Sequence, residues 1–252
     1  MEAEKKRVLV VSAHAVDFVW RAGGTIAQYA KNGHAVKIID VTLGQRGESE
    51  SLWKNRPGIS EEEVTDIRKQ EARRAAEVLG AEISFYDMED HLLTFEKTDI
   101  MRLALDIRKF HPGIVLTHSR YDPLNTDHDN VHKAVIAALR IANVTGTFPE
   151  IPPTGQVQIF TFEPDQPDMC KFIPDTIIDV SDVYGVKLEA MKQVPTQAFM
   201  VETYGRRTAH RGSLAIRFKK GIQYAEGFAR VRPMWESSLT ERRGGEMILQ
   251  SL

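Results

Sequence analysis

Cysteine is nearly absent from this chain: Cys170 is the only one among 252 residues. One cysteine cannot build an intrachain disulfide framework, and such a composition is typical of proteins in a reducing compartment. We therefore expect a cytoplasmic protein. The length is sufficient for one large α/β domain with a sizeable core.

The sequence also lacks an excess of either charge. Its 33 Lys and Arg residues oppose 35 Asp and Glu residues, which gives a formal net charge of −2. A near-neutral chain does not present the broad basic surface that binds nucleic acid or acidic membranes. No apolar run is long enough to span a bilayer, and the polar N-terminus leads directly into the first expected strand without a signal-peptide pattern. We expect neither a nucleic acid nor a membrane as partner.

What the sequence does contain is a regular alternation of strand-like and helix-like segments. Such alternation is typical of a parallel sheet covered by helices on both faces. We predict a Rossmann-like three-layer α/β fold with a mostly parallel central sheet. The expected strands cover residues 8–12, 36–41, 83–86, 114–117 and 158–162, and the expected helices cover residues 24–32, 60–79, 99–110, 127–142 and 183–196. We expect a single domain over residues 1–252, with its C-terminal segment, about residues 181–252, covering or completing the site.

The end of the first expected strand carries His14 and Asp17, three residues apart. The uninterrupted apolar run before them is typical of a parallel strand buried on both faces. Ligand-binding groups in open α/β sheets collect beyond the carboxyl ends of such strands. His14 and Asp17 are therefore candidate metal ligands, although a helix-capping Asp beside a packed His would give the same pattern.

A second polar loop follows residues 114–117 and is dense in His and Asp. Neutral imidazole and carboxylate oxygen suit Zn²⁺, and a catalytic zinc site usually has three protein ligands and one position for water or substrate. We predict that Zn²⁺ or another divalent metal is held by His14, Asp17 and His128. His132 lies one helical turn after His128, and is either a fourth ligand or a residue outside the ligand shell.

These motifs resemble those of the zinc-dependent de-N-acetylases of the PIG-L or LmbE-like type. The family signature Ala-His-Pro-Asp-Asp, followed by Gly-Gly-Thr, aligns with Ala13-His14 and with Gly23-Gly24-Thr25. Its second motif, His-Pro-Asp-His, ends on His128. The resemblance implies that the family's metal-binding residues fall on His14, Asp17 and His128.

Two positions depart from the family pattern. The family's first Asp, the general base on the zinc-bound water, is Val16 here, and a valine cannot accept a proton. The first His of the second motif, which assists at the tetrahedral intermediate, is Asn125. Metal binding is thus retained while the hydrolytic residues are not. An inactive homologue fits this pattern, and so does a different reaction on the same metal.

A third loop favours the different reaction. Glu48 follows the expected strand at residues 36–41, and loops after neighbouring parallel strands face the same edge of the sheet. Glu48 can therefore supply the carboxylate that Val16 lacks, with Arg46 beside it, although a solvated Arg/Glu turn is common. The chain resembles one branch of the family, the 4-oxalomesaconate hydratases, in the motifs Trp20-Arg21, Arg46-Gly-Glu-Ser49, Thr161-Phe-Glu-Pro164 and Tyr224-Ala-Glu-Gly227.

The resemblance to this branch implies a hydro-lyase of gallate or protocatechuate degradation. It would add water to 4-oxalomesaconate, a tricarboxylate enone, and give 4-carboxy-4-hydroxy-2-oxoadipate. The metal would act as a Lewis acid on the enolate oxygen, and Glu48 would be the general base. His118 is the candidate proton donor, and Asp127 is expected to orient a metal-binding histidine.

A tricarboxylate substrate also needs cationic partners, and guanidinium groups hold carboxylates best. The candidate substrate-binding residues are Arg46, Arg120, Asn125, Arg206 and Arg211, with Arg21 as a further arginine near the metal. Arg206 and Arg211 would reach the site through the C-terminal segment or from a neighbouring subunit, and we expect a homo-oligomer.

Two rival interpretations remain open. In the nearer one, the chain is a zinc-dependent de-N-acetylase of an N-acyl sugar or related amide, with Glu48 replacing the missing base. In the farther one, it is a metal-binding or regulatory homologue without turnover. Release of acetate from such amides would distinguish the first, and bound zinc without turnover would distinguish the second.

Overall fold

A computed structural model describes residues 5–231 of the chain. The strands of this part form one sheet in the order β3-β2-β1-β4-β5-β7-β6. They are β1 (Arg7–Ser12), β2 (Ala35–Thr42), β3 (Glu82–Met88), β4 (Ile114–Thr117), β5 (Gln158–Phe162), β6 (Thr176–Asp179) and β7 (Ala225–Arg230). The first five strands run parallel, whereas β7 is antiparallel to both β5 and β6. The predicted α/β fold with a mostly parallel sheet is confirmed.

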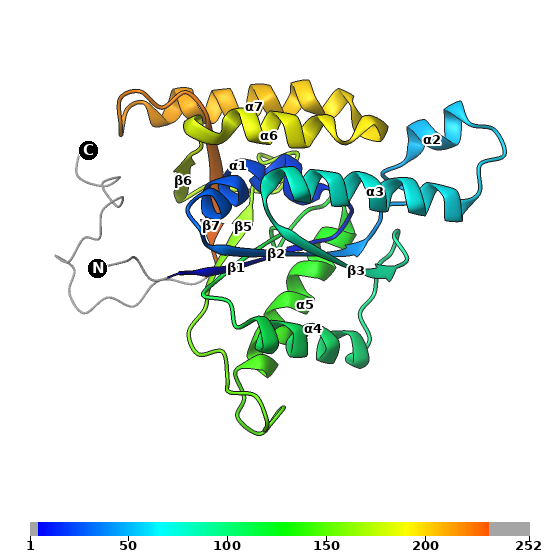
Figure 1. The fold of residues 1–252 in the computed structure, drawn as a ribbon, viewed down its shortest axis with the longest axis vertical. Coiled ribbons are helices and arrows are strands. Elements are labelled where there is room, and N and C mark those ends of the chain that lie inside the picture. Colours follow the sequence, from blue (N-terminus) through cyan, green and yellow to red (C-terminus); the bar gives the residue numbers. More distant parts are fainter. Residues whose placement is uncertain (1–4, 232–252) are drawn as a thin grey trace.

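Helices cover both faces of the sheet (Figure 1). Helices α1 (Asp17–Lys31), α3 (Glu61–Leu79), α6 (Tyr184–Lys192) and α7 (Phe199–Ala215) lie on one face. Helices α4 (Lys97–Phe110) and α5 (Thr126–Ala142) lie on the other, and the short α2 (Glu50–Asn55) projects from the loop after β2. Two 3₁₀ turns, η1 (Ser181–Val183) and η2 (Pro195–Gln197), flank α6.

The alternation of side chains along β1 explains why this strand is apolar throughout. Val8 and Val10 join the core cluster under α1, α3 and α6, whereas Leu9 and Val11 join the cluster under α4 and α5. Successive strand residues point to opposite faces of a sheet. A strand between two helical layers therefore buries both its faces, and residues 8–12 of β1 are all buried, as the sequence pattern indicated.

The five expected strands are all present, and β4 and β5 have the predicted bounds. The expected start of the first helix at residue 24 is wrong, because α1 begins at Asp17 and places Gly23 and Gly24 in its interior. A Cβ on Gly24 would lie 2.7 Å from Cβ of Val180. Glycine is needed there for the close approach of the segment after β6, not for a helix start.

The C-terminal third also differs from the sequence prediction. The single helix expected over residues 183–196 is divided into η1, α6 and η2, with Pro195 at the first position of η2. The sequence analysis assigned no element to α2, β6, α7 or β7. Among residues 5–231, none of the helices combines the length and the apolar character that a bilayer span requires.

Candidate metal centre and active site

The candidate site lies where the strand order of the sheet changes direction. β1 pairs with β2 on one side and with β4 on the other, and β2 and β4 follow β1 in opposite directions across the sheet. Crevices at such switch points, outside the carboxyl ends of the strands, are the usual ligand sites of open α/β sheets. His14 and Asp17 follow β1, and His128 lies in the first turn of α5 after β4.

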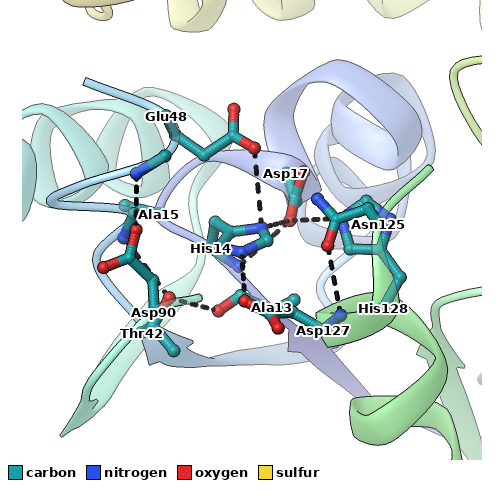
Figure 2. Close-up of polar contacts among 12 residues, drawn as sticks. Ala13, His14, Ala15, Asp17, Thr42, Glu48, Asp90, Asn125, Asp127 and His128 are labelled. Atoms are coloured by element: carbon teal, nitrogen blue, oxygen red, sulfur yellow. Dashed lines mark hydrogen bonds and ion pairs between the residues drawn. The ribbon is translucent and has the colours of Figure 1, made fainter. Parts of the chain in front are cut away.

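The three predicted metal ligands come together in the structure. One ligand atom from each of His14, Asp17 and His128 lies within 4.8 Å of the other two, and all three residues are buried. Oδ2 of Asp17 lies 3.3 Å from Nδ1 of His14 and 3.6 Å from Nε2 of His128. Figure 2 shows these side chains converging from their two loops. Among the described residues, no other group of His, Cys, Asp or Glu has this geometry.

The surroundings of the cluster fit a divalent metal. Nε2 of His128 is buried and has no hydrogen-bond partner within the described part of the chain. Its other ring nitrogen, Nδ1, lies 2.8 Å from Oδ2 of Asp122. Nε2 of His14 likewise lies 3.3 Å from Oδ2 of Asp127. Metal-binding histidines usually have a carboxylate on the nitrogen that faces away from the metal, and two nitrogens with one carboxylate oxygen suit Zn²⁺.

Charge around the cluster is balanced by specific contacts. Burial alone would lower the pKa of His14, but its hydrogen bonds with Asp127 and Asp17 outweigh burial and raise it well above the usual value. Burial alone would raise the pKa of Asp17, but the Arg21 guanidinium and the two histidines beside the carboxylate hold it well below its usual range. Nε of Arg21 donates to Oδ1 of Asp17 over 3.3 Å. This contact leaves Oδ2 directed toward the histidines.

Glu48 reaches the cluster from the loop after β2. Its Oε1 lies 4.0 Å from Nδ1 of His14, and 31% of its side chain is exposed (Figure 2). Gly44 has φ +62°, and a Cβ there would lie 2.7 Å from Cβ of Glu48. The backbone N–H groups of Arg46 and Gly47 donate to the Asp90 carboxylate. These contacts hold the loop after β2 in place, and the Glu48 carboxylate is directed at His14.

Asp127 and Asn125 lie at the start of α5. The Asp127 carboxylate accepts from the backbone N–H groups of His91 and Leu93, at 3.0 and 2.9 Å, as well as contacting His14. These contacts hold the Asp127 carboxylate beside His14, and its role in orienting that histidine stays a prediction. Oδ1 of Asn125 accepts from the backbone N–H of Asp127 over 3.2 Å and caps the helix.

His118 lies behind the cluster, and its contacts argue against the proton-donor role. Its Nε2 accepts from the backbone N–H of Ala13 over 2.8 Å. Burial, reinforced by the nearby His128, lowers the pKa of His118 well below its usual value, so the imidazole is neutral. Its ring stacks on that of His128 with centroids 4.1 Å apart. Nδ1 of His132 donates to the carbonyl oxygen of His118 over 2.9 Å, and His132 is not part of the cluster.

The structure does not bring the predicted substrate-binding arginines to the cluster. The Arg46 guanidinium pairs with Glu61, and half of the Arg46 side chain is exposed. Arg206 pairs with Glu202 on the surface of α7. Arg211 forms a bidentate pair with Glu163, at 2.8 and 2.7 Å. Arg120 is exposed in the loop after β4.

Asp122 and Gln197 lie at the site without a predicted role, and Arg21, a candidate substrate-binding arginine, contacts Asp17 instead. Asp122 orients His128, and its place among the polar residues after β4 was the available signal. Arg21 lies four residues after Asp17, the spacing of neighbours on one helix face, but the expected helix began too late to use it. Gln197 donates to Oε2 of Glu48 over 2.9 Å, and no local pattern marks it.

Comparison with known proteins identifies similar chains. A family model described as GlcNAc-PI de-N-acetylase (PIG-L) matches residues 9–139. A 4-oxalmesaconate hydratase of Pseudomonas putida is 38% identical over 238 residues, which cover 92% of this chain and 92% of the relative. A diacetylchitobiose deacetylase of Thermococcus kodakarensis is 26% identical, with 86% of this chain and 84% of the relative covered.

A solved structure gives the same result for the fold. The crystal structure of GalB, the 4-carboxy-2-hydroxymuconate hydratase from Pseudomonas putida KT2440, matches with a TM-score of 0.90 at 38% identity. The match covers 93% of this chain and 99% of that chain.

Proposed function

The chain belongs to the PIG-L family of metal-dependent enzymes, and we propose that it is a hydratase, a hydro-lyase that adds water to 4-oxalomesaconate. The product would be 4-carboxy-4-hydroxy-2-oxoadipate. The hydratase relatives, 38% identical over most of both chains, support this assignment. One observation carries it: Val16 stands where the deacetylases have their base, while Glu48 approaches His14 from another loop.

We propose His14, Asp17 and His128 as the ligands of a divalent metal, with Zn²⁺ as the metal that suits this donor set. When bound, the metal would supply Lewis-acid stabilisation of the negative charge that develops on the substrate's 2-oxo group. Asp127 and Asp122 would hold the two imidazoles in place. Arg21 would hold the far oxygen of Asp17.

Glu48 is the proposed general base. Its Oε1 faces the cluster and would take a proton from the attacking water, whose hydroxyl joins C4 of the enone. C3 takes up a proton from solvent and Glu48 returns its proton to solvent, so that the net reaction adds one water across C3 and C4. General-base help of this kind is typically worth roughly a hundred- to ten-thousand-fold in rate. The approach of its Oε1 to within 4.0 Å of Nδ1 of His14 supports this role.

The experiment that tests the function is a direct assay of both reaction classes on the purified protein. We expect loss of 4-oxalomesaconate absorbance with formation of the hydrated product, and no release of acetate from N-acetylglucosaminides. Rapid release of acetate without hydration would favour the de-N-acetylase alternative, the activity of the more distant relatives. Bound metal without turnover of either substrate would favour a non-enzymatic homologue.

Two further proposals concern the metal and the assembly. Elemental analysis of the protein as isolated should give close to one Zn²⁺ per chain, and another divalent ion in its place would change only the identity of the metal. The predicted homo-oligomer is tested by the solution mass from light scattering, which a monomer would contradict.

A further inference from the structure

Behind Glu48 lies a buried polar network that the proposed mechanism does not use. Arg68 and Glu71 of α3 have no exposed surface and form an ion pair at 2.8 Å. Oε1 of Glu71 also accepts from the backbone N–H and the hydroxyl of Thr196, at 2.9 and 2.7 Å. The pair is thus joined to η2, a part of the chain 125 residues away.

Arg68 connects this pair to the loops of the candidate site. Its Nη2 donates to the carbonyl oxygen of Ala15, at 2.8 Å, in the loop that carries His14. Its Nε donates to the carbonyl oxygen of Leu43, at 3.4 Å, at the start of the loop that carries Glu48. The same Nη2 donates to Oε1 of Gln197 over 3.0 Å.

The contact with Arg68 fixes the direction of the Gln197 amide. A guanidinium can only donate hydrogen bonds, so the atom of Gln197 that faces it must be the carbonyl oxygen. The amide NH₂ then has to face the other way, toward Glu48, where Nε2 donates to Oε2 over 2.9 Å. Gln197 is 5% exposed, and the reversed amide would place two donors together at Arg68.

We propose that Gln197 is a positioning residue for Glu48. It holds Oε2 of the carboxylate, so that Oε1 stays directed at the cluster, 4.0 Å from Nδ1 of His14. Glu48 is partly exposed and would otherwise be free to adopt other rotamers, a freedom that costs free energy to remove during each catalytic cycle. The inference rests on Glu48 being the base of the proposed function, and it names the residue that orients this base.

The test is a double-mutant cycle between Gln197 and Glu48. Gln197→Met preserves the approximate side-chain volume and removes the donor, and should lower kcat by about 10- to 100-fold, as loss of an orienting partner typically does. KM should stay within about threefold, because the substrate contacts are unchanged. In the double variant with Glu48→Gln, the Gln197 substitution should cause no further loss, because its effect passes through Glu48.

Gln193→Met is the matched control. Gln193 lies just after α6, and its side chain donates to the carbonyl oxygen of Glu189, away from the site, so the same substitution there should leave kcat unchanged. The metal content and the melting temperature of each variant show whether the substitution has disturbed metal binding or the fold. If Gln197→Met does not fold, Gln197→Glu replaces it: the new carboxylate still accepts from Arg68 but repels Glu48, and kcat should fall as well.

Two results would overturn the inference. The first is a kcat within twofold of wild type in the folded Gln197 variant. The second is a loss that multiplies with that of Glu48→Gln, which would indicate a role independent of Glu48. If the wild-type protein does not hydrate the substrate, the proposed function fails by itself. A crystal structure of Gln197→Met then decides the inference, which is wrong if the Glu48 carboxylate keeps its position.

Discussion

At the scale of single residues, Val16 shows most clearly how this chain departs from its family. The valine is fully buried and has φ 74°, in the left-handed region that a β-branched side chain rarely adopts. Asp and Asn tolerate this backbone conformation better than valine does. The backbone therefore still suits the acidic residue of the family motif, and the change to valine is not explained by local conformation.

Restoring the acid tests the proposed reaction. Val16→Asp should relieve backbone strain but place a carboxylate beside Asp17, close to an anionic substrate. At an effective dielectric constant of roughly 20, two unit charges about 8 Å apart repel by about 2 kcal/mol, or about thirtyfold in rate. We expect kcat/KM for hydration to fall by about this factor. A variant that hydrates faster than wild type would contradict the proposed role of Val16.

Glu48 and Arg46 provide a second test because they are close in sequence but face different surroundings. Glu48→Gln should lower kcat by about a hundredfold or more and leave KM within a few-fold, as expected for loss of a general base. Arg46 pairs with the exposed Glu61, so Arg46→Ala should leave both constants within about threefold, whereas its sequence position alone would predict a raised KM. Steady-state kinetics of both variants measures these changes in kcat and KM, and metal analysis shows that both still bind metal. A near-native kcat in Glu48→Gln would mean that another residue is the base.

At the scale of elements, the first helix depends on contacts far along the chain. The backbone N–H groups of Gly24 and Thr25 each donate to Glu226 of β7 over 2.8 Å. The same carboxylate pairs with the buried Lys187 of α6 at 2.6 Å. The glycine segment of α1 and Glu226 thus pack together. The local pattern around Gly23 and Gly24 predicted a helix start because it carries no trace of this distant partner.

The two glycines of α1 allow a matched comparison. A Cβ at Gly24 would lie within 3.0 Å of three Val180 atoms, whereas one at Gly23 would lie 3.3 Å from Cγ of Lys187 and 3.8 Å from its next neighbours. Gly24→Ala should reduce the free energy of unfolding by about 1–3 kcal/mol, the usual cost of overpacking. Gly23→Ala should be close to neutral, because the gain in helix propensity, about 0.5–1 kcal/mol, offsets the tighter contact. Urea denaturation would show this order, and equal effects at both sites would contradict it.

The difference between local sequence patterns and contacts across the fold explains how much of the structure was predictable. Strands β1 to β5 each contain a short segment rich in β-branched or aromatic residues, so local composition was sufficient. The edge strand β6 has four half-buried residues, and β7 contains Glu226, whose partners lie 201 and 202 residues away. The three metal-ligand candidates follow strand ends and were found, whereas Gln197 and the pairing of Arg46 with Glu61 depend on tertiary contacts that leave no local signal.

At the scale of the whole molecule, the candidate metal centre joins the loops after β1 and β4. Binding to the folded state alone stabilises a protein by about 2.7 kcal/mol when the free metal is a hundred times its dissociation constant. For a chain of this size, that corresponds to a rise in melting temperature of roughly 5–10 °C. Chelation should therefore lower the melting temperature reversibly, and calorimetry before and after addition of Zn²⁺ measures the change.

His14→Ala provides the control for this prediction. It should lose most of its metal and its activity, and its melting temperature should no longer respond to chelator or to added Zn²⁺. Full metal occupancy in this variant, measured by elemental analysis, would remove His14 from the ligand set.

The bond between Glu226 and the first helix also has a consequence for synthesis of the protein. All three candidate ligands have been translated by residue 128, but the carboxylate that α1 needs emerges roughly a hundred codons later. Contacts of such long sequence separation slow folding, because the entropy of closing the loop is lost before the contact forms. A nascent chain on the ribosome can thus present all three candidate metal ligands while the helix that carries Asp17 still lacks the anchor that β7 supplies.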